Sequence, residues 1–188
     1  IHNHEIELYQ ILNFIYNVDA SSVIYSVGKF YYDGEIIQQD YAVAREYFDI
    51  SAEMNNADAF FHIGKLYHYG QGVGQDYKKA KEYYEIAAQQ NKPTAINNLG
   101  VLYFNGAGVE KDYKKAKEYF ELVAQQNEPT AINNLGMLYF HGAGVEKDYE
   151  KAKEYFELAD KYNYIVAKYN LGLIYQKGLC GKKDYPKA

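Results

Sequence analysis

Two glycine-rich stretches contain the residue types of a phosphate-binding loop. They are Gly70-Gln71-Gly72-Val73-Gly74 and Gly178-Leu179-Cys180-Gly181-Lys182-Lys183. Backbone N–H groups of such a loop can surround a phosphate, but nucleotide-binding loops of this kind follow a β-strand and open a helix. No strand pattern precedes either stretch. We therefore expect these glycines to form connections between helices, where the backbone needs residues with positive φ.

The histidines could bind a metal, but their spacing does not support a site. His62 and His68 are six residues apart, whereas two histidine ligands on one helix face are four residues apart. His2 and His4 lie in an end of the chain that we expect to fray. The sequence therefore predicts no metal site and no cofactor.

Cys180 is the single cysteine of the 188 residues. The neighbouring Lys182 and Lys183 could lower the pKa of its thiol, but no histidine lies near it in the sequence to act as a base. One cysteine also excludes an internal disulfide framework, which favours a reducing compartment such as the cytoplasm. We predict that the chain has no catalytic residue and is not an enzyme.

The overall composition limits the partners. The formal net charge of −5 argues against non-specific binding to nucleic acid, which depends on Lys and Arg that neutralise phosphates. No apolar run approaches the roughly 18 residues that span a bilayer, so we expect no membrane insertion. Hydrophobic residues make up 48% of the chain, enough to bury a core.

A period of 36 residues organises the sequence. Glycine recurs at this spacing in two series, and tyrosine, aspartate and alanine each recur in one more. The glycine series are Gly28, Gly64, Gly100, Gly136 and Gly172, and Gly34, Gly70, Gly106, Gly142 and Gly178. A fixed period of this length is typical of stacked repeats.

Each unit contains two patterns of helical spacing. In the unit that begins at Thr94, the apolar face of the first helix, the A helix, consists of Ala95, Leu99, Leu102 and Tyr103. The apolar face of the second helix, the B helix, consists of Ala116, Phe120 and Val123. Asp112 precedes the B helix as a favoured N-cap, and Asn127 follows it as a residue that tolerates the left-handed conformation. Each unit is therefore predicted to be a helical hairpin.

Gly100 lies in the middle of the A helix, where glycine is less favourable than alanine by about 1 kcal/mol. Its position beside Ile96 and Tyr103 is on the flank expected to meet the B helix. We predict that it lets the two helices approach closely, so that Gly100→Ala destabilises the protein despite its better helix propensity.

The repeated segments Leu-Gly-x2-Tyr, Gly-x-Gly-Val and Asp-Tyr-x-Lys-Ala-x2-Tyr-Phe together resemble the Sel1-like repeat family. They recur within residues 59–88, 95–124 and 131–159, with a looser copy at 23–52 in which Gly34-Glu35-Ile36-Ile37 replaces Gly-x-Gly-Val. The resemblance implies an all-α fold: a right-handed α/α superhelical solenoid of 36-residue helix-turn-helix repeats, related to tetratricopeptide arrays. It also implies an adaptor that holds other proteins.

We expect one array over residues 1–188. Its predicted parts are the B helix of a partial repeat at 1–21, repeats at 22–57, 58–93, 94–129 and 130–165, and a truncated repeat at 166–188. Neither end has an evident polar capping helix, and an uncapped array exposes an apolar face. This predicts a piece of a longer protein, or a chain whose ends a partner covers.

The face of each A helix opposite its apolar stripe is the predicted binding surface. By resemblance to tetratricopeptide arrays, this face lines a concave groove. Exposed aromatic side chains there would anchor a partner, and asparagine can bond a peptide backbone. The predicted partner-binding residues are Tyr25, Tyr32, Phe61, His68, Tyr69, Asn97, Val101, Phe104, Asn105, Asn133, Met137, Phe140, His141, Tyr169 and Leu173. In an alternative interpretation, some of these aromatics pack between adjacent A helices.

The sequence thus predicts a non-enzymatic scaffold that holds a protein or peptide partner in this groove. An accessory array within a larger protein or enzyme, such as an adaptor associated with a kinase or ubiquitin ligase, is the second hypothesis. An enzyme ranks lowest. Cysteine-rich bacterial relatives are reported to bind or hydrolyse β-lactams, but they have paired cysteines in each repeat, which this chain lacks.

Overall fold

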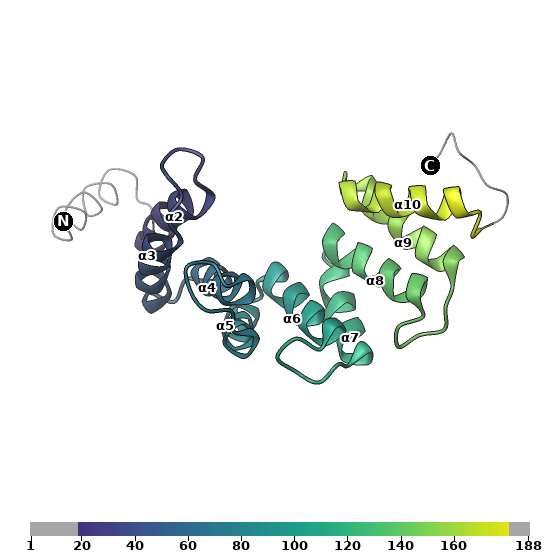
Figure 1. The fold of residues 1–188 in the computed structure, drawn as a ribbon, viewed down its shortest axis with the longest axis horizontal. Helices are drawn as coiled ribbons and strands as arrows, with labels where there is room; N and C mark the ends of the chain where they lie inside the picture. The colour runs from purple at the N-terminus through teal and green to yellow at the C-terminus, as the bar shows by residue number, and fades with distance from the viewer. Residues whose placement is uncertain (1–18, 181–188) are drawn as a thin grey trace. The chain divides into compact units, whose positions relative to one another are not determined.

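The computed structural model describes residues 19–180, which form helices and no strands (Figure 1). The predicted all-α fold is therefore confirmed over this part of the chain. Residues 1–18 and 181–188 lie outside the described part. They include most of the partial repeat predicted at 1–21, the histidines His2 and His4, and the lysines Lys182 and Lys183. Between residues 19 and 180, each helix is too short or too polar to cross a membrane.

The described helices alternate between A and B types, as the period predicts. The A helices are α2 (Ala20–Asp33), α4 (Ala57–Tyr69), α6 (Pro93–Asn105), α8 (Pro129–His141) and α10 (Ile165–Lys177). The B helices are α3 (Tyr41–Glu53), α5 (Tyr77–Gln89), α7 (Tyr113–Ala124) and α9 (Tyr149–Lys161).

Contacts divide the chain into two compact units, residues 1–95 and 96–188, with the boundary near the start of α6. In the first unit α2 packs on α3, α3 on α4, and α4 on α5. In the second unit α7 packs on α8, α8 on α9, and α9 on α10. The B helices α3 and α9 therefore each pack within their own hairpin and against the A helix that follows.

An aspartate joins the two helices of each hairpin, which confirms the predicted N-cap. The side-chain oxygens of Asp40, Asp76, Asp112 and Asp148 accept backbone N–H groups in the first turn of their B helices at 2.9 to 3.1 Å. The backbone N–H groups of the same aspartates donate to the backbone carbonyl oxygens of Tyr31, Tyr67, Tyr103 and Tyr139 at 2.9 to 3.0 Å. Each aspartate thus fixes the start of one helix against the end of the other.

The turns also follow the sequence prediction. Asn55, Asn91, Asn127 and Asn163, which follow the B helices, have φ values between 58° and 64°. Gly70 and Gly72 of the first phosphate-loop-like stretch both have a φ of 68°, and Gly70 ends α4 as a left-handed C-cap. Gly178 ends α10 in the same way. Gly70 and Gly72 therefore form a helix connection, Gly178 ends a helix, and a helix rather than a strand precedes each stretch.

The glycine in the middle of α2, α4, α6 and α8 makes room for an aromatic ring of the B helix that follows. A Cβ atom added at Gly100 would lie 2.5 Å from Cε1 of Phe120, and one at Gly136 would lie 2.6 Å from Cε1 of Phe156. Both rings are buried. The predicted close approach is confirmed, with an aromatic side chain as the group in contact.

Tyrosine pairs join the helices at a second point. Tyr103 of α6 stacks on Tyr119 of α7 with ring centroids 5.8 Å apart, and Tyr139 of α8 stacks on Tyr155 of α9 at 5.6 Å. Nζ of Lys115 lies 4.3 Å from the centroid of the Tyr103 ring and donates to the Tyr103 hydroxyl at 2.8 Å. This contact accounts for a lysine in the first turn of α7, where the helix dipole disfavours a cation.

Candidate partner-binding site

A pocket of about 200 Å³ lies between α6 and α8 in the second unit, and we refer to it as the α6/α8 pocket. Its lining residues are Val101, Phe104, Asn105, Phe120, Asn134 and Met137. Four of them, Val101, Phe104, Asn105 and Met137, belong to the predicted binding surface. Two consecutive A helices thus bring together residues that are 36 positions apart in the sequence.

The pocket is apolar at its base and polar at its edge. Phe120 of α7 is fully buried, and Val101 and Phe104 pack half-buried against the core of this unit. The Phe104 ring meets the edge of Tyr113 with centroids 5.4 Å apart, which fixes its orientation. Asn105 is exposed and offers an unburied amide. Apolar walls with a few amides are the usual lining of a site for an uncharged organic group.

Asn134 is a site residue that the sequence analysis missed. Its Nδ2 donates to Oδ1 of Asn97 at 2.9 Å, which holds the amide at the pocket. This bond uses one of the hydrogen-bonding positions of an amide that has two N–H donors and an oxygen with two lone pairs. The Asn-Asn pair that is repeated in α6 and α8 was the signal that could have identified it.

Asn97 and Asn133 correct the sequence prediction, which expected both to be exposed. Their exposed fractions are 8% and 4%. Oδ1 of Asn97 accepts from Asn134, and Oδ1 of Asn133 accepts from Nδ2 of Asn170 at 2.8 Å. The prediction considered one hairpin alone, in which this flank faces solvent, whereas the A helix of the next repeat covers it. Both residues bond neighbouring A helices to each other.

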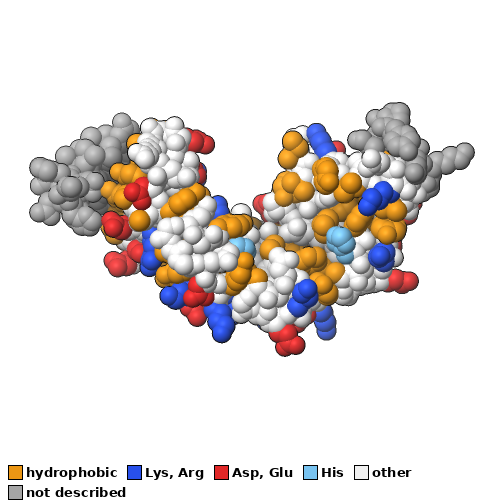
Figure 2. Space-filling model, viewed as in Figure 1, with side chains coloured by type: hydrophobic (Ala, Val, Ile, Leu, Met, Phe, Trp, Pro, Cys, Tyr) orange, Lys and Arg blue, Asp and Glu red, His pale blue; other side chains and the backbone are white. Residues whose placement is uncertain are grey.

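Hydrophobic side chains also gather over α8 and α10 on the face shown in Figure 2. Met137 and Phe140 of α8 are half-buried against the core of this unit, and Leu173 of α10 is half-buried as well. His141 is exposed beside the Phe140 ring, with centroids 5.1 Å apart, and Tyr169 of α10 is 67% exposed. The predicted exposure holds for His141 and Tyr169.

In the first unit, the alternative interpretation of the aromatics holds. Tyr25, Tyr32 and Phe61 are half-buried, and their ring centroids lie 5.3, 5.3 and 5.1 Å from that of His62. Lys65 lies over the Tyr32 ring at 4.7 Å. These residues pack between α2 and α4 around a histidine, so they form structural contacts rather than an open surface.

His62 is buried and uncharged at neutral pH. Its Nδ1 lies 3.0 Å from the carbonyl oxygen of Asp58 and 3.3 Å from the Tyr25 hydroxyl. Burial lowers the pKa of His62 to about 4, and the bond to the Asp58 carbonyl opposes this shift without cancelling it. In the part of the chain that the structure describes, no His, Cys, Asp and Glu side chains group as a metal site would require.

His68 and Tyr69 lie at the end of α4. His68 is half-buried against Tyr69, Tyr77 and Tyr84, with centroid distances of 4.6, 5.4 and 6.1 Å, and burial lowers its pKa. Tyr69 is exposed, as predicted. Both residues belong to the first unit, and neither lines the α6/α8 pocket.

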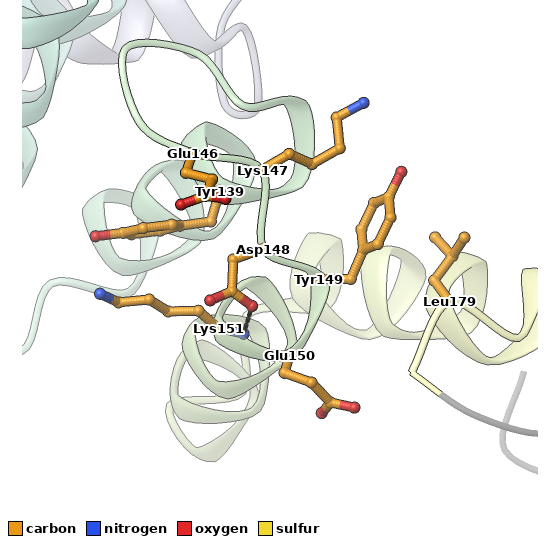
Figure 3. A pocket seen from close by; sticks show the side chains of 8 residues that line it. All are labelled: Tyr139, Glu146, Lys147, Asp148, Tyr149, Glu150, Lys151 and Leu179. Atoms are coloured by element: carbon orange, nitrogen blue, oxygen red, sulfur yellow. Dashed lines mark hydrogen bonds between the residues drawn. The ribbon is translucent and has the colours of Figure 1, made fainter.

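The loops between A and B helices form a second kind of cavity, which is charged. One of about 530 Å³ is lined by Tyr139, Glu146, Lys147, Asp148, Tyr149, Glu150, Lys151 and Leu179 (Figure 3). A matching cavity of about 520 Å³ lies one repeat earlier, at Tyr103, Val109, Glu110, Lys111, Asp112 and Lys115. In the first cavity, Asp148 caps α9 and Lys151 lies over the Tyr139 ring at 4.4 Å. These charged groups therefore hold the hairpin together.

Cys180 is a half-buried free cysteine next to Glu150 in space. Burial raises the pKa of its thiol to about 11, and the nearby Glu150 carboxylate adds to this effect. The thiol is therefore protonated at neutral pH and is a poor nucleophile. The lysines that could have lowered its pKa lie outside the described residues.

Solved structures similar to this chain support the same fold. A Sel1 repeat protein from Oxalobacter formigenes is 29% identical over 99% of this chain and 78% of its own, with a TM-score of 0.78. The protective antigen c5321 of uropathogenic Escherichia coli is 26% identical, with a TM-score of 0.59; the match covers 89% of this chain and 44% of the antigen. This chain thus spans less than half of the antigen's length.

A third similar structure is the immunity protein Pa5087 of Pseudomonas aeruginosa, 23% identical over 90% of this chain and 62% of its own, with a TM-score of 0.67. At this identity the likeness shows the fold alone. A comparison with curated proteins gives no match. The family described as Sel1 repeat matches residues 21–56, 57–92, 93–128, 129–159 and 165–188. Because these matches cover most of the chain and agree with its helical hairpins, the protein belongs to the Sel1 repeat family.

Proposed function

We propose that the chain is a non-enzymatic scaffold that binds a protein or peptide partner through the A-helix surface of its second unit. The observation that carries this proposal is the α6/α8 pocket, which opens between two consecutive A helices. Its volume of about 200 Å³ suits a single large side chain of the partner. The partner is held in this way by burial of one apolar side chain and by hydrogen bonds at the edge.

Two amides supply the polar part of the contact. Asn105 at the end of α6 and Asn134 on α8 stand at the pocket, and an amide can donate to a peptide carbonyl and accept from a peptide N–H group. Neither amide depends on the sequence of the partner, because every peptide backbone offers both groups. The apolar pocket therefore provides selectivity, and the amides orient the bound segment.

Asn105→Trp tests the proposal because Asn105 is exposed and the added ring would obstruct the pocket without entering the core. Leu122→Ala is the control, since Leu122 is 49% exposed on the B helix α7 and does not line the pocket. We expect affinity purification followed by mass spectrometry to recover partners with the wild-type chain and with Leu122→Ala, and to lose them with Asn105→Trp. Thermal unfolding checks that all three chains are folded.

Equal recovery of the same partners by Asn105→Trp would show that the partner binds elsewhere. Failure of the folded wild-type chain to recover any partner from the cells that express it would contradict the scaffold proposal itself.

A further inference from the structure

The charges around the α6/α8 pocket extend the proposed function to the chemistry of the partner. We propose that the bound segment is a peptide in which an apolar side chain is accompanied by an acidic residue. The apolar side chain fills the pocket, and the carboxylate pairs with a lysine ammonium at the loop end of the A helices. This inference rests on the proposed function and concerns the partner of the same site.

A lysine stands beside each of the two aromatic edges of this surface. Phe104 meets Tyr113 at 5.4 Å, and Nζ of Lys111 lies 5.7 Å from the centroid of the same tyrosine ring. One repeat later, Phe140 meets Tyr149 at 5.5 Å, and Nζ of Lys147 lies 5.9 Å from that ring. In both repeats, a tyrosine ring thus lies between a phenylalanine ring and a lysine ammonium. This arrangement places an exposed ammonium near an apolar side chain in each of the two repeats.

Asp112, Asp148 and Glu146 of the same loops are directed elsewhere. Asp112 and Asp148 cap their B helices, with backbone N–H donors at 2.9 Å. Figure 3 shows Glu146 beside Tyr139, whereas the Lys147 side chain extends away from the carboxylates, on the side to which the Tyr149 hydroxyl points. Lys147 is exposed, and its ammonium is available to a ligand on that side.

The A helices of the second unit carry no acidic residue. Their Lys, Arg and His residues from position 96 onward are His141, Lys168 and Lys177. Up to residue 180, the acidic residues of this unit lie on α7, α9 and the connecting segments, in a chain whose net charge is −5. The A-helix surface is thus neutral to basic on an acidic protein. A segment with carboxylates is attracted to this surface, whereas a basic segment is not stabilised there.

Short random peptides displayed on phage and selected on the purified full chain test this inference. We expect the recovered peptides to place Asp or Glu near Leu, Met or Phe, and to lose binding to Asn105→Trp. A recovered peptide is then synthesised, and its affinity is measured by fluorescence polarisation at two salt concentrations. Lys111→Ala combined with Lys147→Ala should weaken binding about fivefold. The effect should be smaller at high salt, because each ion pair between a lysine and a peptide carboxylate is exposed and partly screened.

Lys114→Ala combined with Lys161→Ala is the matched control. Both lysines are exposed on B helices of the same unit, so this variant has the same change in net charge. It should change the affinity by less than about twofold. Peptides that bind in a manner sensitive to Asn105→Trp, but with no preference for acidic residues and no effect of the Lys111 and Lys147 changes, would overturn this inference and leave the proposed function standing. If no recovered peptide responds to Asn105→Trp, both fail.

Discussion

Nδ2 of Asn134 donates to Oδ1 of Asn97 at 2.9 Å and bonds α8 to α6 across 37 positions of sequence. The next pair of A helices has the same bond between Asn170 and Asn133, at 2.8 Å. A repeat of 36 residues thus bonds to the following one through a residue one position further along the helix. This side-chain bond fixes how far one A helix can slide along the next, because a shift by one turn would leave buried amides unpaired.

Asn133→Ala should lower the free energy of unfolding by about 1 to 3 kcal/mol, because it leaves the buried Nδ2 of Asn170 without its partner. Urea denaturation monitored by circular dichroism measures the change. The double variant Asn133→Ala with Asn170→Ala should lose less than the sum of the two single changes, since neither amide is then left unpaired. Strict additivity would contradict a direct bond between them.

Gly100→Ala should also destabilise the protein, by about 1 to 3 kcal/mol, although alanine is the better helix former. The new Cβ would lie 2.5 Å from Cε1 of the buried Phe120 ring, closer than such atoms can approach, so the ring or one of the two helices must shift. Gly74→Ala is the control, because nothing lies within 4 Å of a Cβ at that position. Thermal unfolding decides the matter: a melting temperature of Gly100→Ala at or above that of the wild type would reject this packing argument.

The stability of the first unit should fall as the pH decreases from about 6.5 to about 4, owing to His62. Burial holds the pKa of His62 near 4 in the folded chain, whereas the unfolded chain binds the proton near 6.5. The unfolded state therefore binds more protons throughout this range, so the contribution is complete above it and is lost as the pH falls. The shift corresponds to about 3 kcal/mol.

His62→Asn isolates this effect, because asparagine occupies the equivalent position at Asn134 and Asn170. Carboxylates also titrate below pH 5, in the wild type and in His62→Asn alike. The relevant quantity is therefore the difference in free energy of unfolding between the two chains at each pH. We expect this difference to change by about 3 kcal/mol over the range. A constant difference would contradict a buried, uncharged His62.

Cys180 should react slowly with a thiol-labelling reagent in the native protein at neutral pH, because burial raises the pKa of its thiol to about 11. The labelling rate should rise when urea unfolds the chain. Glu150→Gln should increase the rate in the folded protein, since the Glu150 carboxylate contributes to the raised pKa. Native and unfolded chains that react at the same rate would contradict the protonated, half-buried thiol.

The sequence was sufficient wherever a residue acts within its own hairpin. Asp112 caps α7, Asn127 adopts a left-handed conformation, and Gly100 admits the B helix, all as its pattern predicts. The helical positions of these residues depend on local geometry alone. The family could also be predicted from the sequence, because its repeat pattern consists of residues that act within one hairpin.

The sequence was insufficient wherever a second hairpin decides the environment. Asn97 and Asn133 lie on a flank that is polar and open in an isolated hairpin, yet the next A helix buries both. Tyr25 and Tyr32 likewise pack around His62 of the following repeat. A helical wheel contains no information about that neighbour. Val101, Phe104, Asn105 and Met137 line the α6/α8 pocket after the repeats have stacked, and their role in binding a partner stays a prediction.

The stacked tyrosines have an optical consequence. The chain has 23 tyrosines and no tryptophan. Tyrosine therefore dominates both its near-ultraviolet absorption and its intrinsic fluorescence. The rings of Tyr103 and Tyr119 lie at 20° to each other, and those of Tyr139 and Tyr155 at 13°, with each pair linking the two helices of one hairpin. Neighbouring phenols held in this way interact as coupled chromophores. Each of these two hairpins therefore contains its own spectroscopic reporter of whether its two helices are paired.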